Sequence, residues 1–156
     1  MITKTGDWTL FRTKLNQLST NLFPSAKAKL YENGKLVVEK IEGHIDRQDL
    51  PWVSLSEATL MQKSTTDIYV ETGALRDSFC VTKTKENSKG VTYHIGVSPT
   101  KVHPESGMKY TDILMYMEYG TLTQPSRPLI QPTNREIQNQ LKQEWIQFLQ
   151  EEIGGR

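Results

Sequence analysis

The chain has 156 residues, which fits one domain, and its hydrophobic content of 36% with a mean hydropathy of -0.55 lies on the polar side for a globular protein. Nineteen basic and eighteen acidic residues leave a net charge of +1, which argues against a dedicated nucleic-acid binder, and the single Cys80 excludes an intrachain disulfide. The N-terminus lacks the apolar region of a signal peptide, and no apolar stretch approaches the ~20 residues of a membrane span, so we expect a soluble protein made in the cytoplasm.

The N-terminal part, residues 1–48, is predicted to be helical. Apolar side chains recur at three- and four-residue spacing over residues 8–22, and Asp7 is placed to cap the first turn. We expect Pro24 to end this helix, with the option of starting the next, because proline is tolerated in a first helical turn. A second apolar stripe runs over residues 26–47. Asn33-Gly34 interrupts this stripe, so it fits either one long helix or two short ones.

A short helix is predicted after Pro51. Ser54 and Glu57 have the spacing of a capping box, and the helix would run through Leu60 to Gln62. Residues 63–67 are polar, and we expect them to form a loop.

The middle of the chain changes to the alternating pattern of β-strands. Residues 79–84 and 91–97 alternate at a period of two, and the six residues between them are all polar or glycine. This pattern predicts a β-hairpin with a loop at residues 85–90. On its buried face we expect Phe79, Val81, Val91, Tyr93, Ile95 and Val97.

A loop over residues 98–109 and a helix over residues 110–119 follow the hairpin. Gly120 stands where a glycine would end that helix. Pro125, Pro128 and Pro132 favour an extended arm over residues 121–132, because proline fixes φ and lacks an N–H group.

The C-terminus is predicted to be an amphipathic helix that opens on a second capping box, Thr133 and Glu136, and ends at Gly154. Its apolar stripe comprises Ile137, Leu141, Trp145, Phe148, Leu149 and Ile153. The elements together predict one α+β domain over residues 1–156, with N-terminal helices, a central antiparallel β-hairpin sheet, an extended Pro-rich arm and a C-terminal amphipathic helix.

Few residues point to catalysis or metal binding. His44, His94 and His103 fall on a predicted helix, strand and loop at spacings that no metal site uses, and there is no cysteine pair to complete a zinc site. Cys80 and His94 lie on one hairpin face within about two residues of being opposite, as a Cys–His nucleophile would need. A half-buried cysteine near a surface histidine is the simpler interpretation. We therefore expect no enzyme, no catalytic residue, no metal and no cofactor.

Two segments resemble a known family. The first is Glu71-Thr72-Gly73-Ala74-Leu75-Arg76-Asp77-Ser78-Phe79, in which Thr72 can cap a short helix, Leu75 would point inward and a strand begins at Phe79. The second is Met117-Glu118-Tyr119-Gly120-Thr121, followed by Ser126-Arg127-Pro128-Leu129-Ile130-Gln131-Pro132. In order and spacing, residues 50–153 resemble the tail-completion and virion-morphogenesis proteins of tailed bacteriophages, also described as neck or head–tail joining proteins.

The resemblance implies a structural virion protein that forms a homo-oligomeric ring, expected to be a hexamer, on top of the tail tube. It would complete the tail and join it to the head–tail connector protein. Its partners would be copies of itself, the tail tube or terminator protein and the connector, with at most non-specific DNA contact and no membrane. It would be assembled in the host cytoplasm and located in the tail or neck of the virion. The family motif and interface residues would be Thr72, Gly73, Leu75, Glu118, Gly120, Thr121, Arg127 and Pro128.

The Pro-rich arm fits docking onto a neighbouring subunit, because a stiff segment loses little entropy when it becomes ordered. Arg127 would then reach a carboxylate or backbone carbonyls across the interface, with Glu118 as one candidate partner. In the alternative interpretation, the arm folds onto its own sheet and Arg127 is solvated.

Two other functions stay open at this point. One is a tail terminator, a ring that stops tube polymerisation instead of joining the head. The other is a nucleic-acid-binding module that contacts phosphates through Lys83, Lys85 and Lys89 on the hairpin. The balanced charge and the lack of a basic stripe with interleaved aromatic residues argue against the second.

Overall fold

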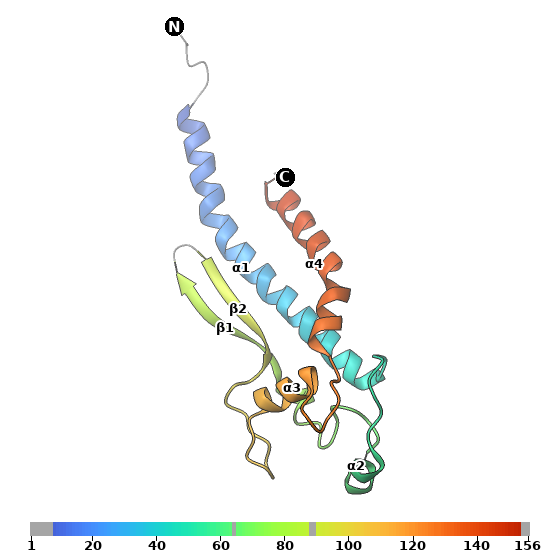
Figure 1. The fold of residues 1–156 in the computed structure, drawn as a ribbon. Helices are drawn as coiled ribbons and strands as arrows, with labels where there is room; N and C mark the ends of the chain where they lie inside the picture. The colour runs from blue at the N-terminus through green and yellow to red at the C-terminus, as the bar shows by residue number, and fades with distance from the viewer. Residues whose placement is uncertain (1–7, 64, 88–89, 154–156) are drawn as a thin grey trace.

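The computed structural model describes residues 8–63, 65–87 and 90–153 and has an α+β fold, as predicted (Figure 1). The helices and strands, in chain order, are α1 (Trp8–Arg47), α2 (Glu57–Gln62), the 3-10 helix η1 (Arg76–Ser78), β1 (Phe79–Asn87), β2 (Gly90–Val97), α3 (Tyr110–Tyr119) and α4 (Ile130–Ile153). The predicted loops at residues 63–67 and 98–109 contain no helix or strand where the structure describes them, apart from one bridge between Val102 and Lys109.

α1 is one continuous helix of 40 residues, so the single long helix is the correct interpretation of residues 26–47. The expectation that Pro24 ends a helix is wrong, because α1 runs through it. Pro24 and Thr20 are both exposed, so the carbonyl group that loses its helical N–H partner can bind water. The expected cap, Asp7, lies outside the described residues.

Asn33 and Gly34 do not break α1 but mark a close packing point. A Cβ atom on Gly34 would lie 2.9 Å from Val81 Cγ1, so the missing side chain lets the hairpin approach the helix. The buried Asn33 amide, oriented to satisfy its neighbours, donates to Glu144 Oε2 at 3.0 Å and accepts from Trp145 Nε1 at 3.3 Å. This position joins α1 to both the hairpin and α4.

β1 and β2 pair as a two-stranded antiparallel hairpin whose apolar face packs against α1. Phe79 lies opposite Val97, and Val81 lies opposite Ile95. The six residues predicted for the apolar face are all buried or half-buried, which confirms the predicted face. At the far end, the rings of Tyr93 and Tyr31 of α1 lie 5.7 Å apart.

The predicted loop at residues 85–90 is wrong in length. The strands continue to pair as far as Asn87 and Gly90, beyond a shift in register between Lys83 and Lys85. Such a bulge adds one residue to one strand and bends it, so alternation over residues 79–84 does not continue into the paired residues beyond.

Both predicted capping boxes are wrong. α2 begins after Ser56, whose Oγ accepts a hydrogen bond from Thr59 N at 3.3 Å, so Ser54 is not the cap. α4 begins at Ile130, and Thr133 Oγ1 donates to Leu129 O at 2.6 Å instead of accepting from the helix. The last three residues of the predicted arm therefore belong to α4.

α4 runs antiparallel to α1 and packs along it (Figure 1). Ion pairs join Glu136 to Lys40 at 2.5 Å and Glu144 to Lys29 at 2.7 Å. The main core lies where the second half of α1, the base of the hairpin, α3 and the start of α4 meet. Its buried residues are Ile41, Ile45, Ile68, Tyr69, Phe79, Val97, Tyr110 and Leu129.

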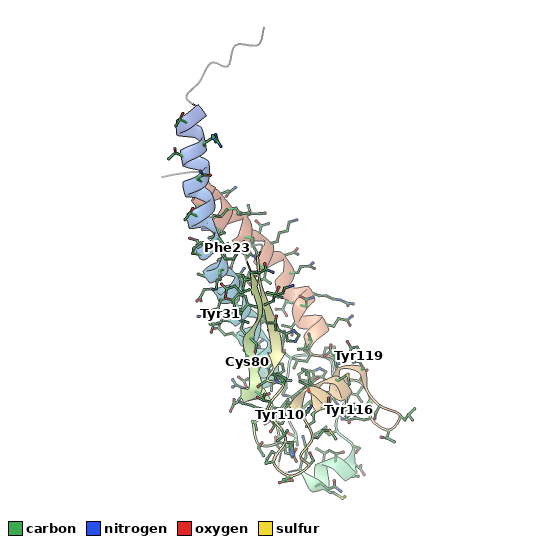
Figure 2. The ribbon with its side chains drawn as sticks, turned by 90° about the vertical axis from the view of Figure 1, so that its left-hand side faces the viewer. Phe23, Tyr31, Cys80, Tyr110, Tyr116 and Tyr119 are labelled. Atoms are coloured by element: carbon green, nitrogen blue, oxygen red, sulfur yellow. The ribbon has the colours of Figure 1, made fainter. Side chains whose placement is uncertain are left out.

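The molecule is elongated. In Figures 1 and 2 the N-terminal end of α1 extends beyond the tip of the hairpin and beyond the end of α4. The chain exposes 11288 Å², whereas a compact monomer of 17.9 kDa would expose about 8,000 Å². Among the described residues, no helix combines the length and the apolar character needed to cross a bilayer.

Candidate functional site

The chain leaves α3 through a glycine, Gly120, whose backbone angles other residues rarely adopt. Gly120 has φ 77° and ψ 177°, a backbone region open essentially to glycine alone. A Cβ atom there would lie 2.9 Å from Ser126 N and 3.0 Å from Gln124 O, because the backbone folds back onto this residue. Gly120 N donates to Tyr116 O at 2.8 Å, so α3 ends at the predicted glycine.

Residues 121–124 form a tight turn, which we call the 121–124 turn. Thr121 N donates to Gln124 O at 2.9 Å, and Thr121 Oγ1 accepts from Thr123 N at 3.3 Å and Gln124 N at 3.1 Å. Leu122 in this turn is 107% exposed, and Tyr119 just before it is 80% exposed. Thr121 thus holds a turn that presents a leucine to solvent.

Glu118 caps the N-terminus of α4 from α3. Its Oε2 accepts from the N–H groups of Leu129 at 2.7 Å and Ile130 at 2.9 Å, and its Oε1 accepts from Gln131 N at 2.9 Å. A negative charge at a helix N-terminus also interacts favourably with the helix dipole. This tertiary cap explains why α4 begins before Thr133, and it shows that Glu118 is not the partner of Arg127.

Arg127 is buried within its own chain, with 3% of its surface exposed. Its Nε donates to Val53 O at 2.7 Å and its Nη2 donates to Ser54 O at 3.1 Å. The side chain is therefore neither solvated nor free to reach a neighbouring subunit, and both expectations for Arg127 are wrong. It ties the segment before α4 to the segment before α2.

Two aromatic residues complete this contact. Tyr69 donates from its hydroxyl to Arg127 O at 2.6 Å, and Trp52 Nε1 donates to Pro128 O at 2.7 Å. The two rings lie 5.2 Å apart. Burial raises the pKa of Tyr69 well above its ordinary value, with a smaller contribution from the Glu118 carboxylate, so the phenol remains a donor. We call Trp52, Tyr69, Glu118, Gly120 and Arg127 the junction.

The first motif segment lies beside the junction. Thr72 Oγ1 accepts from Ala74 N at 3.4 Å, a local turn contact, whereas η1 begins after Leu75 without a side-chain cap. The predicted helix cap at Thr72 is therefore wrong. Gly73 has φ 79° with open space around it, so its backbone angle favours glycine, and Leu75 packs against the core. β1 starts at Phe79, as predicted.

Both motif segments contribute to one cavity of about 390 Å³. Its lining includes Thr72, Gly73 and Leu75 of the first segment, Met117 of the second, and Gln124 of the 121–124 turn. Glu118, Gly120, Thr121, Arg127 and Pro128 lie outside its lining and serve the junction and the turn. The structure thus brings the two motif segments together, although more than 40 residues separate Leu75 from Met117 in the sequence.

The Cys80–His94 pair has the expected register. Cys80 lies opposite Gly96, and Thr82 lies opposite His94, so Cys80 and His94 are diagonal neighbours on the outer face of the hairpin. Cys80 Sγ lies 3.5 Å from Thr82 Oγ1, a hydroxyl that cannot serve as a general base. Among the described residues, no three His, Cys, Asp or Glu side chains are grouped as a metal site would require.

The positive charge of the hairpin is partly neutralised within the chain. Glu86 forms ion pairs with Lys83, at 2.7 Å, and with Lys27 of α1. These two lysines lower the pKa of Glu86 to about 2, with Lys27 making the larger contribution. Lys85 is exposed, and Lys89 lies outside the described residues.

A polar cluster around His44 was not predicted from the sequence. His44 is buried, and its Nδ1 lies 2.5 Å from Asp49 Oδ1. Its Nε2 lies 3.0 Å from Glu136 Oε2, but the alignment is poor and this nitrogen makes no hydrogen bond to the described residues. The hydrogen bond from His44 lowers the pKa of Asp49, whereas Lys40 and then His44 lower the pKa of Glu136.

The sequence held weak signals for the residues that were missed. Tyr69 and Gln48 have positive φ angles of 67° and 51°, which nothing in their residue types indicates. Trp52 lies in a stretch without helical or strand periodicity, so its N–H had no predicted partner. The role of Glu118 depends on a helix that begins twelve residues later, beyond the range of capping patterns.

Comparison of the chain with protein-family models, with curated proteins and with solved structures finds no match.

Proposed function

We propose that this chain is a structural protein of a tailed bacteriophage virion that forms a ring at the neck, completes the tail and joins it to the head connector. The proposal rests on the two segments that resemble tail-completion proteins, Glu71 to Phe79 and Met117 to Thr121 with Ser126 to Pro132. Thr72 and Leu75 of the first segment and Met117 of the second line one cavity, so the resemblance concerns segments that lie together in the fold.

The exposed apolar surface beside the junction supports the assembly role in this proposal. Met115, Tyr116 and Tyr119 of α3 and Leu122 of the 121–124 turn are all exposed, and Figure 2 shows Tyr116 and Tyr119 on α3. Clusters of exposed aromatic and aliphatic side chains are typical of protein–protein interfaces. The same segment is restrained by the close backbone packing at Gly120 and by the hydrogen bonds of Glu118 to the start of α4. This restraint reduces the entropy that binding would cost.

The polar groups with the most ordered contacts support an assembly role over a catalytic one. Glu118 accepts hydrogen bonds from backbone N–H groups of the same chain, and Arg127 donates hydrogen bonds to backbone carbonyl groups of the same chain. A catalytic carboxylate or guanidinium must instead face a substrate. These two side chains fix the segments before α2 and at the start of α4 relative to each other and to α3.

A nonsense mutation in the gene, in a phage that encodes this chain, tests the proposal. On a host without a suppressor tRNA, we expect DNA-filled heads and free tails of normal length in electron micrographs, with infectivity restored by the protein supplied in trans. Free tails of irregular, increased length would identify the chain as the tail terminator instead. Intact, infectious particles would overturn both.

A further inference from the structure

The cavity beside the junction is open to solvent and mostly apolar. It lies between α2, the segment before η1, the loop over residues 98–109 and α3. Its lining includes the half-buried apolar side chains of Leu55, Leu75, Ile113 and Met117. At about 390 Å³ it is large enough for a few side chains, within the range of protein ligand sites.

The charged groups at the edge of the cavity already have partners. Lys63 Nζ donates to Val70 O at 3.3 Å, and Glu71 Oε2 lies 3.6 Å from His103 Nε2. A charged occupant would have to compete with these contacts and be desolvated against an apolar lining. The lining therefore favours an occupant that is uncharged and apolar.

The chain itself presents such a segment. Residues 119–126 contain no charged side chain, although 24% of the whole chain is charged. Leu122 is fully exposed in the turn, so it does not pack against its own chain. Three hydrogen bonds hold the turn, so it keeps its shape before binding.

We propose that the 121–124 turn of one copy inserts Leu122 into this cavity of a second copy. The proposal rests on the proposed function, because it names the contact through which the ring would form. The turn and the cavity of one copy adjoin at Gln124, which belongs to the turn and lines the cavity. A contact from the turn of one copy to the cavity of the next joins unlike sites, so it passes from copy to copy and closes into a ring when the rotation allows. In that arrangement each copy gives a turn to one neighbour and a cavity to the other.

The surface area of the chain is sufficient for two such contacts. The chain exposes 11288 Å² in all. Two standard interfaces remove about 1,600 Å² from one copy. Tyr119, Tyr116 and Met108, exposed around the turn and the cavity, would add to the contact made by Leu122.

Sedimentation velocity of the full chain over a wide concentration range tests this contact. We expect the wild type to sediment as species larger than 17.9 kDa, and Leu122→Asp to raise the dissociation constant at least ~10-fold. The control is Met61→Asp, which places the same charge on an apolar side chain that is 87% exposed on α2 and does not line the cavity. A monomeric wild type, or equal effects of the two variants, would overturn the proposal.

Cross-linking identifies the two surfaces. Two variants are prepared, both with Cys80→Ser. The first carries Leu122→Cys and is labelled with ¹⁵N, and the second carries Thr72→Cys at the cavity. The two proteins are mixed and oxidised. We expect a disulfide between labelled and unlabelled chains, detected by mass spectrometry. If Thr72→Cys is replaced by Met61→Cys, that product should be lost; equal yields would overturn the assignment.

The failure of this contact and the failure of the proposed function have different signatures. If nonsense-mutant particles lose their heads but Leu122→Asp associates like the wild type, the contact is wrong and the neck function stands. If Leu122→Asp is monomeric but particles without the protein are intact and infectious, the contact stands and the neck function is wrong.

Discussion

Two parts of one short segment differ in almost every physical respect. In the 121–124 turn and just before it, Leu122 and Tyr119 are 107% and 80% exposed. A few residues further on, Arg127 and Leu129 are 3% and 0% exposed, and every contact described for Arg127 is made within the chain. The chain therefore passes from full exposure at Leu122 to full burial at Leu129 within seven residues.

Because of this difference, we expect separate residues to determine the stability of the fold and the association of copies. The junction is buried and hydrogen-bonded, so its residues should determine the free energy of unfolding. The turn makes no contact through Leu122, so its residues should determine binding and leave the fold unchanged. Variants in the two parts should consequently give opposite results in unfolding and association experiments.

The largest effect on folding is expected for Gly120→Ala. The new Cβ atom would lie 2.9 Å from Ser126 N and 3.0 Å from Gln124 O, and the backbone angles of Gly120 are nearly exclusive to glycine. We expect the free energy of unfolding, measured by urea denaturation with tryptophan fluorescence, to fall by about 4 kcal/mol.

Gly107→Ala is the matched control. Gly107 also has a positive φ, 67°, but a Cβ atom there would meet no heavy atom within 4 Å. We expect it to cost about 1 kcal/mol. Equal losses for the two variants would show that backbone crowding at Gly120 does not matter.

Arg127→Ala should have the next largest effect. It removes two hydrogen bonds and leaves the carbonyls of Val53 and Ser54 without their partner beside a new cavity. We expect a loss of about 3 kcal/mol in the same urea experiment. Arg135→Ala, on the exposed face of α4, should change the free energy by less than about 0.5 kcal/mol. A loss at Arg127 no larger than at Arg135 would contradict the structure.

The sequence predicted what local patterns determine. The alternation of Phe79, Val81, Ile95 and Val97 gave the hairpin face, and the spacing of residues 110–119 before Gly120 gave α3 and its end. These features depend on residues within a few positions of one another.

Features that depend on distant residues were missed. Arg127 bonds to carbonyls 73 and 74 residues away, and Glu118 caps a helix through N–H groups 11 to 13 residues away. Pro24 lies within α1 although its residue type argues for a helix end. In the candidate site, the sequence named Glu118, Gly120 and Arg127 through a resemblance, while the role of Tyr69 became visible only when the chain was folded.

Glu118→Gln should have a moderate effect. Glutamine keeps one acceptor oxygen, but it loses the negative charge and one of the two oxygens that bind N–H groups at the start of α4. We expect a loss of about 1–2 kcal/mol in free energy of unfolding. Glu105→Gln, in the exposed loop before α3, serves as the control and should be nearly neutral. A neutral result at Glu118 would show that α4 does not need this cap.

A smaller effect is expected at the His44 cluster. Asp49 and Glu136 have pKa values below their ordinary 3.8 and 4.5, so they stabilise the fold above those values, and this contribution is lost as the pH falls through the lowered pKa values. Their side chains are 38% and 48% exposed, which keeps the effect modest. Asp49→Asn should flatten the fall of the urea midpoint between neutral pH and about pH 3. An unchanged slope would contradict the pairing.

Leu122→Ala should have the smallest effect on folding. Because its side chain is fully exposed, its truncation removes no contact within the chain, and the free energy of unfolding of the monomer should stay within about 0.5 kcal/mol of the wild type. Urea denaturation at a concentration low enough to exclude association measures this value. A loss of about 1 kcal/mol or more would show that Leu122 packs within its own fold. A neutral result beside a large loss for Gly120→Ala would show that a rigid junction holds an apolar side chain that the fold itself does not use.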